Sequence, residues 1–253
     1  MSRQDVNIPT PDGDARAFVF TPNEGQGPWP TVLFYMDGLA IRPALFEMGE
    51  RLASNGYYVL MPDMFWRLGG YEPLVPSEVF ANPERRQEFF SKFMTSTDPV
   101  KAMRDTGAFF DWLDKQPKAK ADKIGVTGYC MGGAMALRAA GAFPDRVVAA
   151  GAFHAGGVVT DQPDSPHLLV PKIKAKVLVG GADQDSHFTA DQCAVLDKAM
   201  QDAGVDAKVG IWSGALHGYA PPDMPVFDPE HAERHWREML ALFGEKLKGT
   251  VAA

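Results

Sequence analysis

The sequence lacks the features that would place the chain in a membrane or on nucleic acid. No apolar run approaches the length of a membrane helix, and the N-terminus has no apolar core of a secretion signal. Basic residues are outnumbered, 25 against 32 acidic ones, which gives a formal net charge of -7, and no basic cluster is present. We therefore expect a cytoplasmic protein without a membrane or nucleic-acid partner.

Cysteine is scarce as well, with two residues in a chain of 253. A disulfide between Cys130 and Cys193 is not expected, because the predicted compartment is reducing and Cys193 lies within a helical pattern. Neither cysteine has the close spacing of a zinc site. His231 and His235 are four residues apart, but the sequence HAERH lacks a glutamate directly after the first histidine, which favours a solvated helix face. No metal and no cofactor are predicted.

The remaining composition is that of an ordinary globular protein, with 45% hydrophobic and 23% charged residues. Short apolar runs alternate with longer amphipathic ones, which is typical of a mainly parallel sheet with helices on both faces. We therefore expect one α/β domain over residues 1–253. Strands are predicted at residues 6–8, 16–20, 31–35, 57–61, 123–127, 147–153, 175–179 and 208–212.

The segment from 62 to 98 breaks this alternation. It contains Pro73, Pro76 and Pro83 among aromatic and charged residues, with a short helical pattern near its end. A long excursion of this kind inside an α/β domain is usually functional. We expect it to shape a pocket.

Residues 128–133, GYCMGG in one-letter code, predict a nucleophile elbow between a strand and a helix. Gly128 and Gly132 stand two residues on either side of Cys130, where small residues let the strand and the helix pass closely. The N-terminus of the following helix directs its N–H groups at the sulfur and favours a thiolate. The alternative, an inert buried thiol, fits this strand-turn-helix context less well.

A nucleophilic thiol needs a base and a group that orients the base. In α/β-hydrolases the acid and the histidine follow the nucleophile in that order, on loops after later strands. Asp183 follows the predicted strand at 175–179 and is favoured over Asp185 because it lies nearer the strand end. His217 follows the strand at 208–212, whereas His154 precedes both acids in the chain.

The oxyanion hole of such a site is formed by two backbone N–H groups. One belongs to the residue after the nucleophile, which is Met131. The other comes from the loop after an early strand, here YMDGL at residues 35–39, and Gly38 is the expected donor.

Together these residues resemble the dienelactone hydrolase family of α/β-hydrolases. The resemblance rests on the segments GYCMGG, YMDG, GGAD and LHGY and extends over almost the whole chain. It implies an α/β-hydrolase fold, a triad of Cys130, Asp183 and His217, and an oxyanion hole at Gly38 and Met131. The implied activity is hydrolysis of a carboxylic ester.

The resemblance also implies residues around the thiol and the substrate. Family members often carry an acidic residue just before the first oxyanion donor, where it helps to release the proton of the thiol, and Asp37 occupies that position. The enzyme that names the family holds its substrate's carboxylate with two arginines. Arg85 or Arg86 matches the first, whereas the segment GYAP after His217 has no arginine to match the second; Arg42 is a further candidate.

The sulfur limits which substrates are suitable. A thiolate leaves a tetrahedral intermediate more readily than a simple alkoxide, since a thiol has a pKa of about 8.5. Enol lactones, aryl esters and thioesters are therefore favoured over alkyl esters. We expect a hydrolase of small activated esters or lactones that forms an acyl-thioester intermediate. A thioesterase of the same fold is one alternative, and a non-catalytic small-molecule binder or redox sensor is another.

Overall fold

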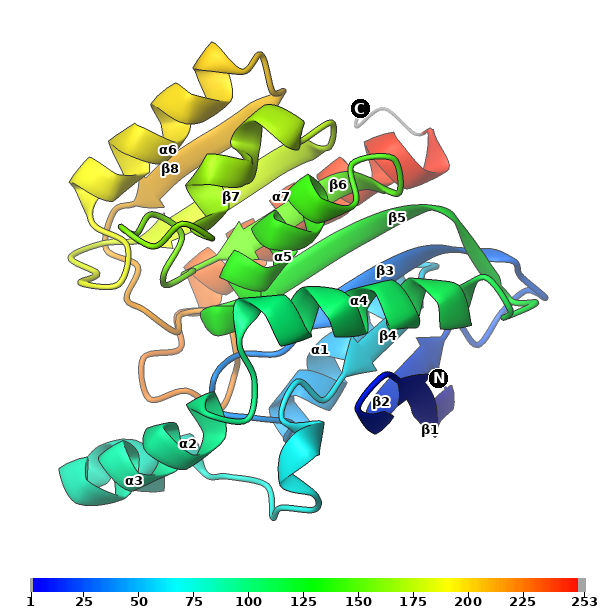
Figure 1. Cartoon of the computed structure of the whole chain (residues 1–253), viewed down its shortest axis with the longest axis horizontal. Coiled ribbons are helices and arrows are strands. Elements are labelled where there is room, and N and C mark those ends of the chain that lie inside the picture. Colours follow the sequence, from blue (N-terminus) through cyan, green and yellow to red (C-terminus); the bar gives the residue numbers. More distant parts are fainter. Residues whose placement is uncertain (1, 250–253) are drawn as a thin grey trace.

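Within residues 2–249, the part of the computed structural model that is described, eight strands form one sheet (Figure 1). Its strand order is β1-β2-β4-β3-β5-β6-β7-β8. The first two pairs in this order are antiparallel, and the other five are parallel. The strands are β1 (Ser2–Thr10), β2 (Gly13–Thr21), β3 (Trp29–Tyr35), β4 (Tyr58–Pro62), β5 (Ala119–Tyr129), β6 (Val147–Phe153), β7 (Lys176–Ala182) and β8 (Ala207–Trp212).

Helices cover both faces of this sheet. Figure 1 shows α4, α5 and α6 in front of it and α1 and α7 behind it. The helices are α1 (Pro43–Ser54), α2 (Pro76–Ala81), α3 (Pro83–Met94), α4 (Pro99–Leu113), α5 (Met131–Ala142), α6 (Ala190–Asp202) and α7 (Pro229–Phe243), with shorter turns η1 (Trp66–Leu68), η2 (Pro166–Lys172) and η3 (Gly244–Lys248). The predicted α/β class, with a mainly parallel sheet, is confirmed. None of the helices described is long and apolar enough to cross a membrane.

The helices begin where the sequence supplies start signals. The Asp98 side chain accepts a hydrogen bond from the Lys101 N–H and so caps α4, which has proline at its first position. At α6, Thr189 and Gln192 form a reciprocal capping box. These local bonds satisfy N–H groups that a helix leaves free at its start.

Six of the eight strands are longer than predicted, and one of them, β7, bears on the site. β7 continues through Gly180 and Gly181 to Ala182, in parallel register with β8. A Cβ added to Gly180 would lie 2.7 Å from the ring of Trp212, so glycine is needed there for close packing within the sheet rather than for a turn. The loop after β7 therefore begins three residues later than the predicted strand end.

The segment between β4 and α4 leaves the sheet and carries η1, α2 and α3 (Figure 1). Phe93 packs α3 against earlier residues of the same segment, with its ring centroid 5.2 Å from that of Phe65 and 5.2 Å from that of Tyr71. Phe90 and Met94 of α3 line a cavity. The excursion thus contributes one wall of that cavity.

Candidate active site

Cys130 is the turning point between β5 and α5. Its backbone has φ of 53° and ψ of -117°, a conformation that costs energy for any residue with a side chain. A Cβ on Gly128 would collide with the main chain of Gly132, and a Cβ on Gly132 would collide with the carbonyl oxygen of Met36. The two glycines therefore permit the tight strand-to-helix turn that exposes the sulfur.

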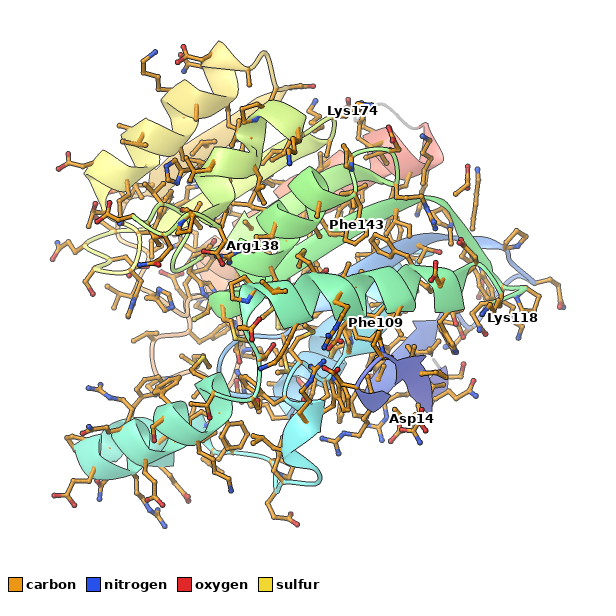
Figure 2. The ribbon with its side chains drawn as sticks, in the orientation of Figure 1. Asp14, Phe109, Lys118, Arg138, Phe143 and Lys174 are labelled. Carbon is orange, nitrogen blue, oxygen red and sulfur yellow. The ribbon has the colours of Figure 1, made fainter. Side chains whose placement is uncertain are left out.

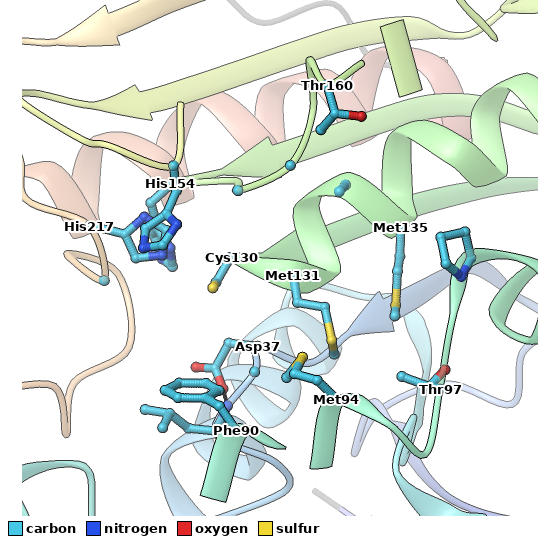
Figure 3. Close-up of a pocket in the computed structure, with 18 of the residues that line it drawn as sticks. Asp37, Phe90, Met94, Thr97, Cys130, Met131, Met135, His154, Thr160 and His217 are labelled. Atoms are coloured by element: carbon cyan, nitrogen blue, oxygen red, sulfur yellow. Dashed lines mark hydrogen bonds between the residues drawn. The ribbon is translucent and has the colours of Figure 1, made fainter. Parts of the chain in front are cut away.

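A cavity of about 1000 Å³ lies in front of Cys130. Figure 3 shows its sulfur between the rings of His154 and His217 on one side and the side chains of Met131 and Met94 on the other. Apolar side chains from α3 and α5 form much of the lining. Ligand pockets commonly have volumes of about 300–1,000 Å³, so this cavity has room for a small molecule.

His217 lies on the loop after β8 and faces Cys130. Its Nδ1 is 2.6 Å from Oδ2 of Asp185. Burial disfavours the imidazolium, but interactions with Asp185 and Cys130 outweigh burial and raise the pKa of His217 to about 10. The ring of His217 is therefore a strong base, held between a carboxylate and the sulfur.

The acid beside His217 is Asp185, not Asp183 as the sequence favoured. The side chain of Asp185 is buried, and its Oδ1 accepts a hydrogen bond of 2.8 Å from the N–H of His187. Burial favours the neutral acid, but the hydrogen bonds from His217 and His187 outweigh it and hold the pKa of Asp185 below its ordinary value. Asp185 is thus an ionised partner with both oxygens engaged.

Asp183 instead ties the loop after β7 to the loop that carries His217. Its Oδ2 accepts a hydrogen bond from Gly214 N–H at 3.0 Å, and its own N–H donates to the carbonyl of Ala215 at 2.6 Å. Because β7 runs to Ala182, Asp183 directly follows the strand and lies beside the loop after β8. The positive φ of Gln184 then turns the loop before the next carboxylate.

The two residues predicted to form the oxyanion hole, Gly38 and Met131, both line the cavity. Met131 is the first residue of α5, so its N–H has no partner within the helix. On the facing loop, the N–H of Leu39 donates to Oδ1 of Asp37 at 2.9 Å and is not free. Gly38 lines the cavity beside it, so the Gly38 N–H is the donor that this loop can offer.

Asp37 does not bind the thiol; its carboxylate is held by Arg42. The Arg42 guanidinium contacts the two carboxylate oxygens at 2.7 and 2.9 Å and also bonds to Asp223. Burial works against the charge of Arg42, but the two carboxylates outweigh it and raise the pKa of the guanidinium. Arg42 is fully buried and outside the cavity lining, so the structure contradicts its expected contact with substrate.

Of the two arginines expected near the substrate on α3, only Arg86 lines the cavity. Arg85 follows the N-cap Asn82, lies outside the lining and is exposed to solvent. Arg86 is exposed as well, at the rim formed by α3. The structure therefore keeps Arg86 as the substrate-contact candidate of this pair.

His154, which the order of the chain had set aside, lies inside the site. Its ring is 5.3 Å from that of His217 and 5.1 Å from that of Tyr219, edge-on to both. Within residues 2–249 neither of its buried ring nitrogens has a hydrogen-bond partner, and burial with nearby positive charge holds its pKa well below the ordinary value. A neutral imidazole therefore packs against His217. A polar residue directly after buried β6 was the available signal, since carboxyl ends of parallel strands meet at one edge.

The histidine pair on α7 has a structural role. His235 is fully buried, with Nε2 2.8 Å from the hydroxyl of Tyr129, so the expectation of a solvated face is wrong at this position. His231 bonds through Nδ1 to Oδ2 of Asp228 at 2.8 Å. Across residues 2–249 no three His, Cys, Asp or Glu side chains lie together in a way that could hold a metal ion.

Known proteins are similar to this chain in sequence and in fold. The family model described as "Dienelactone hydrolase family" matches residues 15–247. A relative from Methylorubrum extorquens named "Putative carboxymethylenebutenolidase" is 28% identical over 242 residues, which cover 93% of this chain and 78% of the relative. The match thus includes the elbow, the oxyanion loop and both loops of the histidine and acid.

Two solved structures confirm the fold. The first, titled "Putative Dienelactone Hydrolase" from Klebsiella pneumoniae, superposes with a TM-score of 0.83 at 20% identity and covers 96% of this chain and 98% of its own. The second, a dienelactone hydrolase from Anabaena variabilis, has a TM-score of 0.68 at 19% identity, with coverages of 97% and 98%. At these identities the likeness concerns the fold, which is the α/β-hydrolase fold expected from the sequence.

Proposed function

Since the chain belongs to the dienelactone hydrolase family, we propose that it hydrolyses small activated esters or lactones with Cys130 as nucleophile. His217 is the base in this proposal, and Asp185 orients it. The observation that carries the proposal is the 2.6 Å contact of His217 with ionised Asp185, on a ring that also interacts with Cys130 at the cavity. A nucleophile, a base and an acid that orients the base are the groups that nucleophilic hydrolysis requires.

The reaction proceeds in two halves. The proton of Cys130 passes to His217, the sulfur attacks the substrate carbonyl, and the N–H groups of Gly38 and Met131 stabilise the oxyanion. The intermediate expels the alcohol, which takes the proton from His217, and leaves an acyl thioester on Cys130. His217 then removes a proton from water, the hydroxide attacks the thioester, and the carboxylic acid and the thiol are released.

The leaving group decides whether the first half goes forward. A thiolate leaves more readily than an alkyl alkoxide, so the intermediate returns to substrate unless the departing oxygen is a weak base. Aryl esters and enol lactones meet this condition. The apolar lining around Met131 and Phe90 favours an uncharged group next to the carbonyl, and Arg86 is placed to contact a charged group at the rim.

Turnover of p-nitrophenyl acetate tests the assignment directly. We expect Cys130→Ala and His217→Ala each to lower kcat/KM by at least ~10³-fold. The nucleophile and the base act as a unit, so removing either one removes the contribution of both. Cys193→Ala is the matched control, since Cys193 is a buried thiol on α6 outside the cavity. Acid quenching of the wild type followed by mass spectrometry should find one acetyl group on Cys130. Equal rates in all four proteins would overturn the triad.

A further inference from the structure

The cavity of Cys130 also contains an arginine that the proposed reaction does not use. Met131, Ala134, Met135 and Arg138 follow the i, i+3, i+4, i+7 spacing of one helix face, and all four line the cavity. Figure 2 labels Arg138 on α5, beside the loop after β6. The helix thus forms an apolar floor that runs from the sulfur to a guanidinium.

The positive charge of Arg138 is poorly compensated by the groups around it. Its Nε donates to the main-chain oxygen of Asp164 at 3.3 Å, and within residues 2–249 no carboxylate pairs with its guanidinium. Burial lowers the pKa of Arg138, and the more distant charge of Asp164 only partly offsets this. Arg42, by contrast, is buried with two carboxylates in direct contact. A guanidinium has five N–H donors, so most donors of Arg138 are available to a ligand.

The loop after β6 adds two more polar side chains to this end of the cavity. Thr160 and Gln162 both line it, and Figure 3 shows Thr160 on the side away from the histidines. The Thr160 oxygen accepts a bond from the Gln162 N–H, and neither side chain donates a hydrogen bond to another residue in the range 2–249. Polar donors that converge at one end of an apolar pocket are the usual means of fixing a ligand's orientation.

We infer that Arg138 binds a carboxylate that the substrate carries at a distance from its reacting carbonyl. The inference deepens the proposed function and rests on it for the identity of the reacting group. The guanidinium matches a carboxylate in a two-point contact, and a substrate anion supplies the partner that Arg138 lacks. The site differs from Arg86 and from the segment after His217, where the family resemblance places carboxylate contacts.

The helix geometry sets the length of such a substrate. Arg138 lies eight positions after Cys130, which corresponds to about 12 Å between their Cα atoms along α5. Side chains on a helix lean toward its N-terminus, which here is the end with Cys130, so the guanidinium lies nearer to the sulfur, at roughly 6–10 Å. An extended chain of about five to eight bonds spans this distance.

Kinetics with paired esters test this inference. One pair is mono-p-nitrophenyl suberate and its methyl ester, which place the anion on the acyl side; the other is a 4-hydroxyphenylalkanoic acid acetate and its methyl ester, which place it on the leaving group. In the wild type we expect the anion to be preferred in one pair. Arg138→Met should reduce that preference by ~10- to 100-fold, the effect of one charge-assisted contact.

The neutral esters serve as the internal control for folding and chemistry. Arg138→Met should hydrolyse them within ~3-fold of the wild-type rate, since the arginine does not touch the reacting atoms in this proposal. Arg138→Lys should keep part of the preference, and Arg85→Met, which removes a charge outside the cavity, should keep all of it. If Arg138→Met retains the full preference, or if the wild type shows none in either pair, the inference is overturned.

A binding measurement separates this inference from the triad. Calorimetric titration of Cys130→Ala with monomethyl suberate should show binding that dimethyl suberate lacks and that Cys130→Ala/Arg138→Met loses. Binding with this pattern in a protein whose wild type hydrolyses none of the esters would uphold the anion site and remove the proposed function. Ester hydrolysis without any such binding would uphold the proposed function and remove the anion site.

Discussion

The elbow at residues 128–133 and the loop at residues 183–187 each carry one group of the proposed triad at the carboxyl edge of the sheet, but different contacts hold them. In the elbow, the main chain of Gly132, four residues along, lies so close to Gly128 that there is no room for a Cβ. The loop is fixed from a distance, because Trp212 of β8 determines where β7 can pack and Gly214 bonds to Asp183. Cys130 is thus positioned by close main-chain packing within the turn, and Asp185 by contacts with the neighbouring strand and its loop.

This difference has a consequence for tolerance to substitution. Main-chain atoms cannot move aside without disrupting the strand and the helix they belong to, so the elbow should reject any added side chain. The contacts of the loop involve side chains, which can shift at moderate cost. Substitutions in the elbow should therefore remove the fold or the activity altogether, whereas those in the loop should have graded effects.

The largest effect is expected from Gly128→Ala. Its Cβ would collide with the carbonyl group of Gly132, and we expect a loss of at least ~4 kcal/mol in the free energy of unfolding, at the upper end for single substitutions. Urea denaturation followed by tryptophan fluorescence measures it. Gly107→Ala on α4 is the control, because its Cβ would meet Phe143 at an ordinary 3.7 Å. A Gly128→Ala protein as stable as the control would refute the local account of the elbow.

The next effect concerns which aspartate serves His217. Asp185→Asn should lower kcat by ~10³- to 10⁴-fold, because the amide cannot stabilise an imidazolium and favours the wrong tautomer. Asp183→Asn keeps an oxygen to accept the Gly214 N–H and should cost less than ~10-fold. Steady-state rates with p-nitrophenyl acetate distinguish the two. The reverse order would restore the acid that the sequence favoured.

The Asp185→Asn variant should also differ from the wild type in how its free energy of unfolding depends on pH. The pKa of His217 is raised to about 10, so its interactions stabilise the fold fully below the ordinary histidine pKa of about 6.5, and this stabilisation is lost as pH rises toward 10. Asp185→Asn removes one cause of the raised pKa. Its free energy of unfolding should therefore fall less than that of the wild type between pH 7 and pH 10.

The sequence predicted the elements that depend on neighbours in the chain. Cys130, the glycines around it and the α/β class all follow from short patterns. Asp185 could not be chosen over Asp183, because the choice depends on the end of β7. That end is set by pairing with β8, about 30 residues later in the chain.

The ion pairs that Arg42 forms with Asp37 and Asp223 were missed for a similar reason. Arg42 reaches Asp37, five residues away, and Asp223, 181 residues away. The second partner lies beyond any local pattern, so the sequence indicated only a substrate contact for Arg42. His154 was set aside because the search followed the chain order of a triad, whereas the sheet brings the ends of β6 and β8 together.

The smallest effect is expected from Gly180→Ala, which tests the long-range account of β7. Its Cβ would lie 2.7 Å from the ring of Trp212, and we expect the shift of that ring to cost ~1–3 kcal/mol in the free energy of unfolding. Gly210→Ala is the matched control, because Gly210 pairs with Gly180 in register and its Cβ would meet nothing within 4 Å. Urea denaturation of both proteins gives the difference. Equal stability would mean that Trp212 does not fix the end of β7, and the position of Asp185 would then need another cause.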